Sequence, residues 1–343
     1  MKWLSMTAPE THDFNQVAAS TNFRAPAASP KTPDKISEPP LVAILLCTYN
    51  GARFIKEQLE SIHNQVHNNV KVWASDDGSS DQTINILRQY RTAWGDEKLN
   101  ITSGPQKGFA ANFLSLTCNP DIHADFFAFA DQDDIWQPKK LSQALTQLQA
   151  IPASTPALYC ARTQLIDEAN NKTGYSPLYK RRPSFNNALV QSLASGNSMV
   201  MNKAARDILC KVGPLHIASH DWWAYMLVTG VGGIVIYDRH PNVLYRQHDQ
   251  NVLGAPLGWR ASKKRINMIL AGRFKNWNDI NIQALQQTRE ILTPKNKAML
   301  NTFSKVRTGN ILTRVTRLWV SGIYRQTTAD ELGLLVAAIL GKI

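Results

Sequence analysis

Residues 41–51 read LVAILLCTYNG, which is an apolar run of seven residues followed by a polar turn. A continuous apolar run of this length is typical of a strand in a parallel sheet that is covered on both faces. Beyond the turn, apolar residues recur at spacings of three or four, which predicts a helix with one buried stripe. They are Ile55, Leu59, Ile62 and Val66. A buried strand that leads into such a helix is the first half of a β-α-β unit.

The alternation of strand and helix continues along the chain. We expect further strands at 70–75, 99–102, 126–130, 158–160, 198–201 and 234–237, and further helices after residue 81, at 110–116 and at 221–228. This order predicts an α/β fold built on a doubly wound, mostly parallel sheet. Ligands of such sheets bind outside the carboxyl ends of the strands. The polar clusters of this chain fall at those ends, so they are the candidates for a functional site.

An acidic cluster, DQDD at residues 131–134, follows the apolar run FFAFA at 126–130. Three carboxylates so close together repel one another unless a cation or several hydrogen-bond donors neutralise them. Two of them can bind a hard divalent ion that takes phosphate oxygens as its other ligands. The alternative is a solvated acidic turn that caps the next helix. The position at the mouth of a buried strand favours the metal site.

Three further clusters are ambiguous when each is taken alone. DDGSSD at 76–81 offers a carboxylate to a nucleobase or a ribose, but a simple turn between strand and helix explains it better. HDWW at 220–223 places an acid beside two indoles, which suits a general base and a stacked sugar, or equally a helix terminus with core tryptophans. YRQH at 245–248 contains groups that bind a diphosphate, although a polar strand end is the simpler interpretation.

The order of these segments is more specific than any one of them. CTYNG, SDDGSSD, ADQDDIW, HDWW and YRQHDQN follow one another between residues 41 and 254, and as a set they resemble the family 2 glycosyltransferases, which have the GT-A fold. The DQDDIW, HDWW and YRQH segments are most similar to the rhamnosyltransferase-like branch that builds bacterial surface polysaccharide. The resemblance implies a GT-A domain at 41–257. The QxxRW segment of processive synthases is missing, which argues against a polymerising enzyme.

On the donor side, the resemblance implies that residues at the strand ends hold the nucleotide sugar. These are Thr48, Asn50, Asp76, Asp77 and Asp131, together with Lys107 on the loop that lies over the donor. Asp131 and Asp133 match the acidic pair that binds Mg²⁺ or Mn²⁺ between the two phosphates. The chain is therefore expected to need a divalent metal ion.

On the acceptor side, Asp221 matches the catalytic base of the family, although His220 stands where glutamate is more common. Trp222, Arg246 and His248 lie where relatives hold the acceptor or the diphosphate. The resemblance then implies a single displacement in which Asp221 takes the proton of the acceptor hydroxyl. One displacement inverts the anomeric configuration and needs no covalent intermediate.

The net charge of +12 belongs mainly to the C-terminal part. From residue 255 onward there are 15 lysines and arginines and four acids, so the preceding residues are nearly neutral. We expect a basic helical extension at 258–343 that associates with the anionic inner leaflet of a membrane, where a lipid-linked saccharide acceptor would be carried. A solvated basic bundle and a docking surface for another protein are the alternatives. The acidic strand ends argue against a nucleic-acid partner.

The first 40 residues, the apolar runs and the cysteines indicate where in the cell the protein is expected. Residues 1–40 hold six of the 17 prolines and predict a flexible leader, and they contain no apolar run of seven that would indicate a secretory signal. No run approaches the roughly 18 apolar residues of a membrane span. The four cysteines are far apart with no CxxC pair, which argues against a zinc site and a disulfide framework. We expect a cytoplasmic protein, peripheral on the inner membrane.

Together these features predict an inverting, metal-dependent glycosyltransferase of cell-surface polysaccharide synthesis. The preferred donor is dTDP-rhamnose, and the acceptor is a hydroxyl of a lipid-linked saccharide. A UDP-hexose-dependent family 2 enzyme is the first alternative. A nucleotidyltransferase and a basic nucleic-acid-binding protein are further alternatives. An NAD-dependent epimerase is disfavoured because no GxGxxG follows the first strand.

Overall fold

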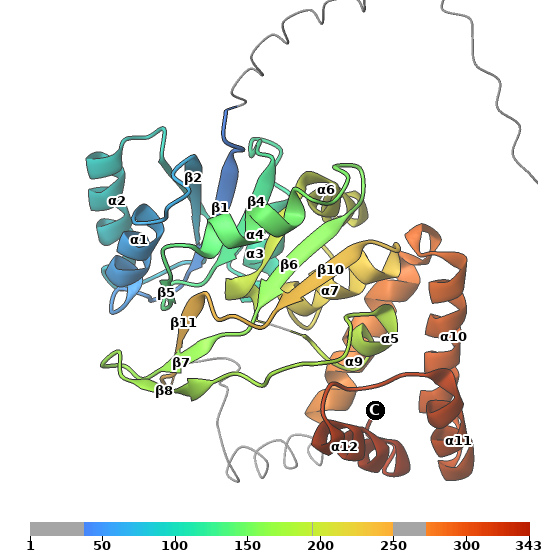
Figure 1. Ribbon diagram of the computed structural model, residues 1–343. Coiled ribbons are helices and arrows are strands. Elements are labelled where there is room, and N and C mark those ends of the chain that lie inside the picture. Colours follow the sequence, from blue (N-terminus) through green and yellow to red (C-terminus); the bar gives the residue numbers. More distant parts are fainter. Residues whose placement is uncertain (1–37, 194, 250–271) are drawn as a thin grey trace, which may run out of the picture. The chain divides into compact units, whose positions relative to one another are not determined.

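A computed structural model describes residues 38–193, 195–249 and 272–343, which form two sheets and the helices around them (Figure 1). The larger sheet has seven strands in the order β10-β6-β9-β4-β1-β2-β3. These strands are β1 (Val42–Thr48), β2 (Val70–Asp76), β3 (Leu99–Ser103), β4 (Phe126–Ala130), β6 (Ala157–Ala161), β9 (Val200–Asn202) and β10 (Ile234–Asp238). Nearly all of the leader predicted at 1–40, and the domain boundary predicted at 257/258, lie outside the described residues.

The larger sheet is mostly parallel, as the sequence predicts. β1 pairs in parallel with β2 and β4, β2 with β3, and β6 with β10. Only β9 among these strands runs antiparallel to its neighbours, β4 and β6. All seven residues of β1 are buried, because helices cover both faces of the sheet.

Alternate residues of β1 belong to two apolar cores on opposite faces. Helices α1 (Ile55–His63), α2 (Thr83–Trp94) and α4 (Lys140–Leu148) supply the core of one face. Helices α3 (Phe109–Thr117), α5 (Phe185–Ala188), α6 (Lys203–Val212) and α7 (His220–Gly230) supply the core of the other face. The TYNG, DDGS and DQDD motifs follow strands of this packed sheet, while HDWW begins helix α7.

Four C-terminal helices add to the second core, which confirms the predicted helical extension. They are α9 (Arg273–Gln287), α10 (Pro294–Thr308), α11 (Ile311–Ser321) and α12 (Thr328–Ile339). Leu300, Phe303 and Leu334 of these helices are buried with residues of α7. Asn296 donates from Nδ2 to the carbonyls of Thr229 and Gly230 at the end of α7. None of the helices in the described segments has the length and hydropathy of a membrane span.

The smaller sheet was not predicted from the sequence. Its four strands, in the order β5-β11-β7-β8, are β5 (Ile135–Trp136), β7 (Gln164–Ile166), β8 (Lys172–Tyr175) and β11 (Val243–Arg246). β5 follows directly after the acidic cluster at 131–134 and pairs antiparallel with β11. This pairing brings the YRQH segment to the acidic cluster, although more than a hundred residues of sequence separate them.

Candidate active site

The loops after β1 and β2 are joined by a network of short hydrogen bonds. Thr48 donates from Oγ1 to Asp76 Oδ1 at 2.8 Å, and Asp76 also accepts from the backbone and the side chain of Ser79. Asn50 Oδ1 accepts from the backbone N–H of Ser80 at 2.8 Å. Three residues that are predicted to bind the nucleotide sugar, Thr48, Asn50 and Asp76, therefore lie together at one edge of the sheet.

Asp77 fixes the loop that follows β3. Its carboxylate accepts from the backbone N–H groups of Gln106 at 2.6 Å and Gly108 at 2.9 Å. Lys107 stands between these two residues and is exposed to solvent. Asp77 is thereby positioned to hold the loop, and Lys107 is presented at the same edge as Thr48 and Asn50.

Gln132 links the acidic cluster to the loop after β1. It accepts from the N–H of Tyr49 at 2.8 Å and donates to the carbonyl of Tyr49 at 2.9 Å. A Cβ added to Gly51 would lie 2.1 Å from Gln132 Oε1, so this close approach requires glycine. The TYNG turn and the DQDD cluster therefore form one connected surface.

The three carboxylates of the acidic cluster have different surroundings. Asp134 is fully buried and accepts from Asn197 Nδ2 at 2.5 Å and from the backbone N–H of Arg246 at 3.2 Å. Asp131 and Asp133 are partly exposed. Burial and the nearby Asp133 and Asp221 carboxylates raise the pKa of Asp131 to about 8. Asp134 is thus a structural anchor, and the predicted pair Asp131 and Asp133 faces outward.

This pair suits a divalent ion. Burial and the repulsion from Asp133 together raise the pKa of Asp131, and a cation bound by both carboxylates relieves that repulsion. Carboxylate oxygens are the ligands that Mg²⁺ and Mn²⁺ prefer, and Mg²⁺ usually takes one or two of them plus substrate phosphates. The described residues contain no group of three or more His, Cys, Asp and Glu that would hold an ion by themselves. A site in which two carboxylates bind the ion and the donor diphosphate supplies further oxygens is consistent with this ligand set.

Lys140, a residue that the sequence analysis did not single out, lies beneath the acidic cluster. It is fully buried with Nζ 3.1 Å from the centroid of the Trp136 ring. Burial lowers the pKa of Lys140 well below its ordinary value, while the charges of Asp134 and Asp131 act in the opposite direction. Nothing in the local sequence marks this lysine, because its neighbours there are ordinary residues at the start of α4.

Arg246 and His248 both contact Asp133 of the acidic cluster. Arg246 is fully buried; it donates from Nε to the Asp133 carbonyl at 2.9 Å, from Nη1 to Asn170 Oδ1 at 2.6 Å and from Nη2 to Glu57 Oε2 at 2.9 Å. His248 Nε2 lies 2.7 Å from Asp133 Oδ2. The structure therefore gives both residues a protein partner at the cluster. Their contact with acceptor or diphosphate, which the resemblance implies, stays a prediction.

Asp221 lies in the first turn of α7, where the helix dipole favours a negative charge. Its Oδ1 accepts from the N–H of Trp222 at 2.7 Å, and its Oδ2 accepts from the N–H of Gly196 at 3.2 Å. Gly196, which binds Asp221, is followed by Asn197, which binds Asp134 of the acidic cluster, so the two carboxylates contact adjacent residues of one segment. Asp221 is thus held beside the acidic cluster, by a different part of the chain.

His220 is enclosed by aromatic rings. It stacks on Phe113 with ring centroids 3.8 Å apart and meets Phe129 edge-on at 4.8 Å. Neither ring nitrogen has a hydrogen-bond partner within the described part of the chain, and burial lowers the pKa of His220 to about 4. A Cβ on Gly196 would lie 2.5 Å from His220 Nε2, so the close contact requires glycine at 196. His220 is a neutral packing residue that fixes the start of α7.

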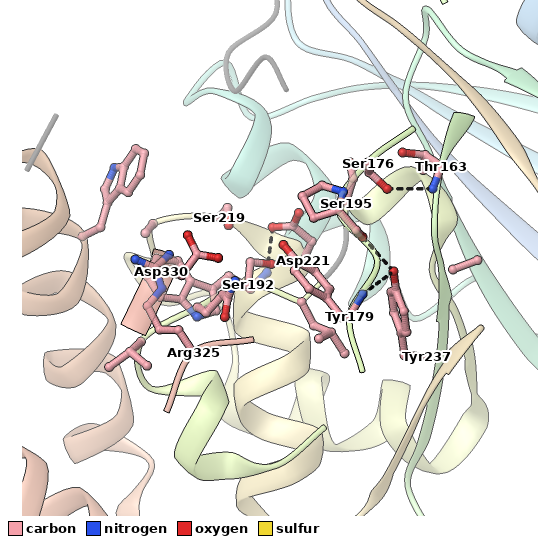
Figure 2. A pocket seen from close by; sticks show the side chains of 18 of the residues that line it. Thr163, Ser176, Tyr179, Ser192, Ser195, Ser219, Asp221, Tyr237, Arg325 and Asp330 are labelled. Carbon is pink, nitrogen blue, oxygen red and sulfur yellow. Dashed lines mark hydrogen bonds between the residues drawn. The ribbon is translucent and has the colours of Figure 1, made fainter. Parts of the chain in front are cut away.

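A pocket of about 370 Å³ opens beside Asp221 (Figure 2). Its lining includes Asp221 and Trp222, whose Nε1 donates to the Ala188 carbonyl at 2.6 Å. Asp131 and Asp133 are not among the described residues that line it. Asp221 therefore stands between the acidic pair on one side and a separate pocket on the other.

Comparison with known proteins identifies the larger part of this architecture. Residues 43–209 match the model of Glycosyl transferase family 2. The matched segment is a glycosyltransferase family 2 domain. Over 237 residues it is 29% identical to the dTDP-rhamnosyl transferase RfbG of Shigella flexneri, covering 65% of this chain and 78% of that protein. This similarity confirms the predicted relation of this family 2 enzyme to the rhamnosyltransferase-like branch.

Two other proteins support the family and the fold. An uncharacterized glycosyltransferase of Haemophilus influenzae is 31% identical over 112 residues, which cover 32% of this chain and 33% of that protein. The crystal structure of S. aureus TarS 1–349 in complex with UDP-GlcNAc superposes with a TM-score of 0.52 at 13% identity, covering 88% of each chain. A likeness at this level of identity concerns the fold, and it confirms the predicted GT-A architecture of this family 2 enzyme.

The sequence analysis missed the segment that positions Asp221 and Asp134. Gly196 holds Asp221 through its N–H, and Asn197 holds Asp134 through its side chain. The sequence does contain a pattern typical of a loop next to a strand, because GNS at 196–198 comes directly before an apolar run. No residue type in that triplet indicates which carboxylate it contacts.

Proposed function

We propose that this family 2 glycosyltransferase transfers L-rhamnose from dTDP-rhamnose to a hydroxyl of a lipid-linked saccharide during cell-surface polysaccharide synthesis. The similarity to a dTDP-rhamnosyl transferase over 65% of the chain supports this donor. The observation that carries the mechanism is the position of Asp221, which shares the 196–197 segment with Asp134 of the acidic cluster and also lines a separate pocket. A base that takes the proton of the acceptor hydroxyl as that oxygen attacks the donor sugar needs a position next to both substrates.

The donor would bind along the edge formed by the loops after β1, β2 and β3. Thr48, Asn50 and Asp76 shape this edge, Asp77 holds the loop after β3, and Lys107 contributes an exposed positive charge toward the diphosphate. Asp131 and Asp133 would hold Mg²⁺ or Mn²⁺. When bound, such an ion neutralises charge on the departing nucleoside diphosphate. Arg246 and His248 act indirectly, because they position Asp133.

Asp221 would act as the general base. Its carboxylate takes the proton of the acceptor hydroxyl as that oxygen forms a bond to the anomeric carbon. The bond from that carbon to the diphosphate oxygen breaks in the same displacement, and the nucleoside diphosphate leaves with the electron pair. The amide donors of Trp222 and Gly196 hold the carboxylate in place for this step. Attack from the face opposite the leaving group inverts the anomeric centre.

Calorimetric titration with dTDP-rhamnose, UDP-glucose and UDP-N-acetylglucosamine tests the donor. We expect binding with Mg²⁺ or Mn²⁺, loss of that binding with EDTA, and tighter binding of dTDP-rhamnose than of either UDP-sugar, because the acidic pair needs a cation before it can approach a diphosphate. Tighter binding of a UDP-sugar would replace the donor and leave the transfer reaction standing. Absence of metal-dependent binding, or release of pyrophosphate in turnover, would contradict the proposal.

The C-terminal helices carry an exposed apolar face, here called the α11–α12 face. It consists of Leu312, Trp319, Val320, Leu332, Leu335, Val336, Ile339 and Leu340. The α12 members are spaced by three, one, three and one residues, which places them on one side of the helix. Trp319 is 86% exposed. We propose that this face lies on the cytoplasmic leaflet of the inner membrane.

Charge near the α11–α12 face fits an anionic lipid surface. Arg314 and Arg317 lie on α11, and Lys342 follows α12. The two acids of α12 lie in its first turn: Asp330 lines the pocket and Glu331 forms an ion pair with Arg181. Trp277 of α9 lines the pocket and is not part of this face.

We expect the full chain to sediment with vesicles that contain phosphatidylglycerol. Trp319→Ala should lower the partition coefficient about tenfold, because a large apolar side chain contributes about 1.5–3 kcal/mol on burial. Trp94→Ala, a partly buried tryptophan on α2, is the matched control and should bind as the wild type does. A wild-type chain that stays in the supernatant at low salt would show that the α11–α12 face has another partner.

A further inference from the structure

The pocket beside Asp221 has walls from two distant parts of the chain. One wall comes from the glycosyltransferase domain and includes Tyr179, Trp222 and Tyr237. The other comes from the C-terminal helices and consists of Phe274, Trp277, Arg325 and Asp330. Figure 2 shows Asp221 between Tyr179 and Tyr237 on one side and Arg325 and Asp330 on the other. The family domain alone therefore leaves one side of this pocket open.

The C-terminal wall is firmly attached to the domain. Gln326, next to Arg325, donates its N–H to Gln191 Oε1 at 2.8 Å, and its side chain donates to the Arg181 carbonyl at 3.1 Å. Asn187 donates to the Tyr324 carbonyl at 3.0 Å. These bonds on both sides of Arg325 fix the backbone of the wall. The pocket is thus a built feature of the fold.

The chemistry of the lining is that of a carbohydrate site. Six aromatic side chains line the pocket: Tyr179, Trp222, Tyr237, Tyr245, Phe274 and Trp277. Aromatic rings pack against the apolar C–H face of a sugar ring, while hydroxyls and carboxylates bind its polar edge. The hydroxyls come from Thr163, Ser176, Ser192, Ser195 and Ser219. The volume of about 370 Å³ lies within the range of roughly 300–1,000 Å³ typical of small-molecule sites.

The charges of the pocket favour an uncharged ring. Among the described residues, two carboxylates, Asp221 and Asp330, line the pocket together with one guanidinium, Arg325, which lies over the Phe274 ring with Cζ 5.4 Å from its centroid. A phosphate or an acidic sugar would meet repulsion from both acids. Neutral hydroxyl groups donate to carboxylates and accept from the guanidinium without that penalty.

We infer that this pocket binds the terminal pyranose ring of the acceptor and that Trp277 and Asp330, from the C-terminal helices, determine which neutral sugar is accepted. The inference rests on the proposed function, in which Asp221 is the base at the mouth of the same pocket. The C-terminal helices then have two roles on different surfaces. α12 lines the pocket with Asp330 and carries exposed apolar residues of the α11–α12 face from Leu332 onward.

Saturation-transfer NMR with methyl pyranosides tests this inference without knowledge of the natural acceptor. The probes are methyl glycosides of rhamnose, glucose, mannose and N-acetylglucosamine, added to the full chain with dTDP and Mg²⁺. We expect at least one probe to bind the wild type. Trp277→Ala and Asp330→Asn should each raise the dissociation constant of that probe about tenfold or more, because one loses the stacking surface and the other a charged acceptor.

Matched controls are Trp94→Ala on α2 and Asp279→Asn on α9, which do not line the pocket. Both should bind the probe within about twofold of the wild type, and melting temperatures report whether every variant folds. Wild-type chain that binds no pyranoside, or pocket variants that bind as the controls do, would overturn the inference. A wild-type chain that does not bind dTDP would instead overturn the proposed function. Calorimetry with dTDP alone therefore separates failure of the proposed function from failure of the pocket inference.

Discussion

Asp221→Asn enzyme is expected to bind its nucleotide sugar like the wild type while its transfer rate falls by about 10²–10⁴. Asparagine keeps the shape of the side chain, and its oxygen still accepts a backbone N–H at the start of α7. It carries no charge and takes no proton from the acceptor hydroxyl. The loss should therefore appear in kcat, measured as acceptor-dependent release of nucleoside diphosphate, with donor affinity measured by calorimetry.

The outcome discriminates between a base and a structural acid. Asp207→Asn is a suitable control, because Asp207 is a half-exposed residue of α6 that pairs with Lys203. This variant should transfer sugar at the wild-type rate. If Asp221→Asn lost donor binding as well, Asp221 would act on the metal pair rather than on the acceptor. Full activity of Asp221→Asn would show that Asp221 is not the general base.

The sequence predicted the larger sheet well because its strands are buried on both faces. The runs at 41–47 and 126–130 are continuously apolar, and the structure has strands at 42–48 and 126–130. A run of that kind has few alternatives, since no amphipathic helix is uniformly apolar at this length. The smaller sheet could not be predicted. Its strand β5 has two residues, and its pairing with β11 depends on contacts across more than a hundred residues of sequence.

For the candidate site, the sequence indicated the residue types and the edge of the sheet, but not what each side chain contacts. Asp131 and Asp133 are the exposed members of the acidic cluster, as the family pattern implies, while Asp134 is buried against Asn197. Arg246 reads like a residue that binds phosphate, yet its guanidinium is fully buried. Such differences are set by tertiary contacts, which leave no periodic pattern in the sequence.

Arg246→Met should lower the stability of the fold by about 3 kcal/mol. The variant keeps the unbranched apolar stem of the side chain but loses the guanidinium, whose Cζ lies 4.5 Å from the centroid of the Phe54 ring. It removes the donors to the Asp133 carbonyl, to Asn170 and to Glu57. Because Glu57 is 40% exposed, water can solvate its freed charge, and the cost falls at the low end of the range for broken buried pairs.

Arg53→Met is a matched control, because Arg53 also lies over the Phe54 ring, with its Cζ 4.7 Å from the ring centroid. Its ion pair with Glu168 is exposed on both sides, so the variant should lose at most about 1 kcal/mol. Thermal unfolding measures the difference, which we expect to be roughly 5–10 °C in melting temperature for Arg246→Met. Donor binding should weaken in the same variant, since Asp133 loses its support. A variant with wild-type stability and impaired binding of the diphosphate would show instead that Arg246 contacts substrate directly, and the buried guanidinium would then have to become accessible when the donor binds.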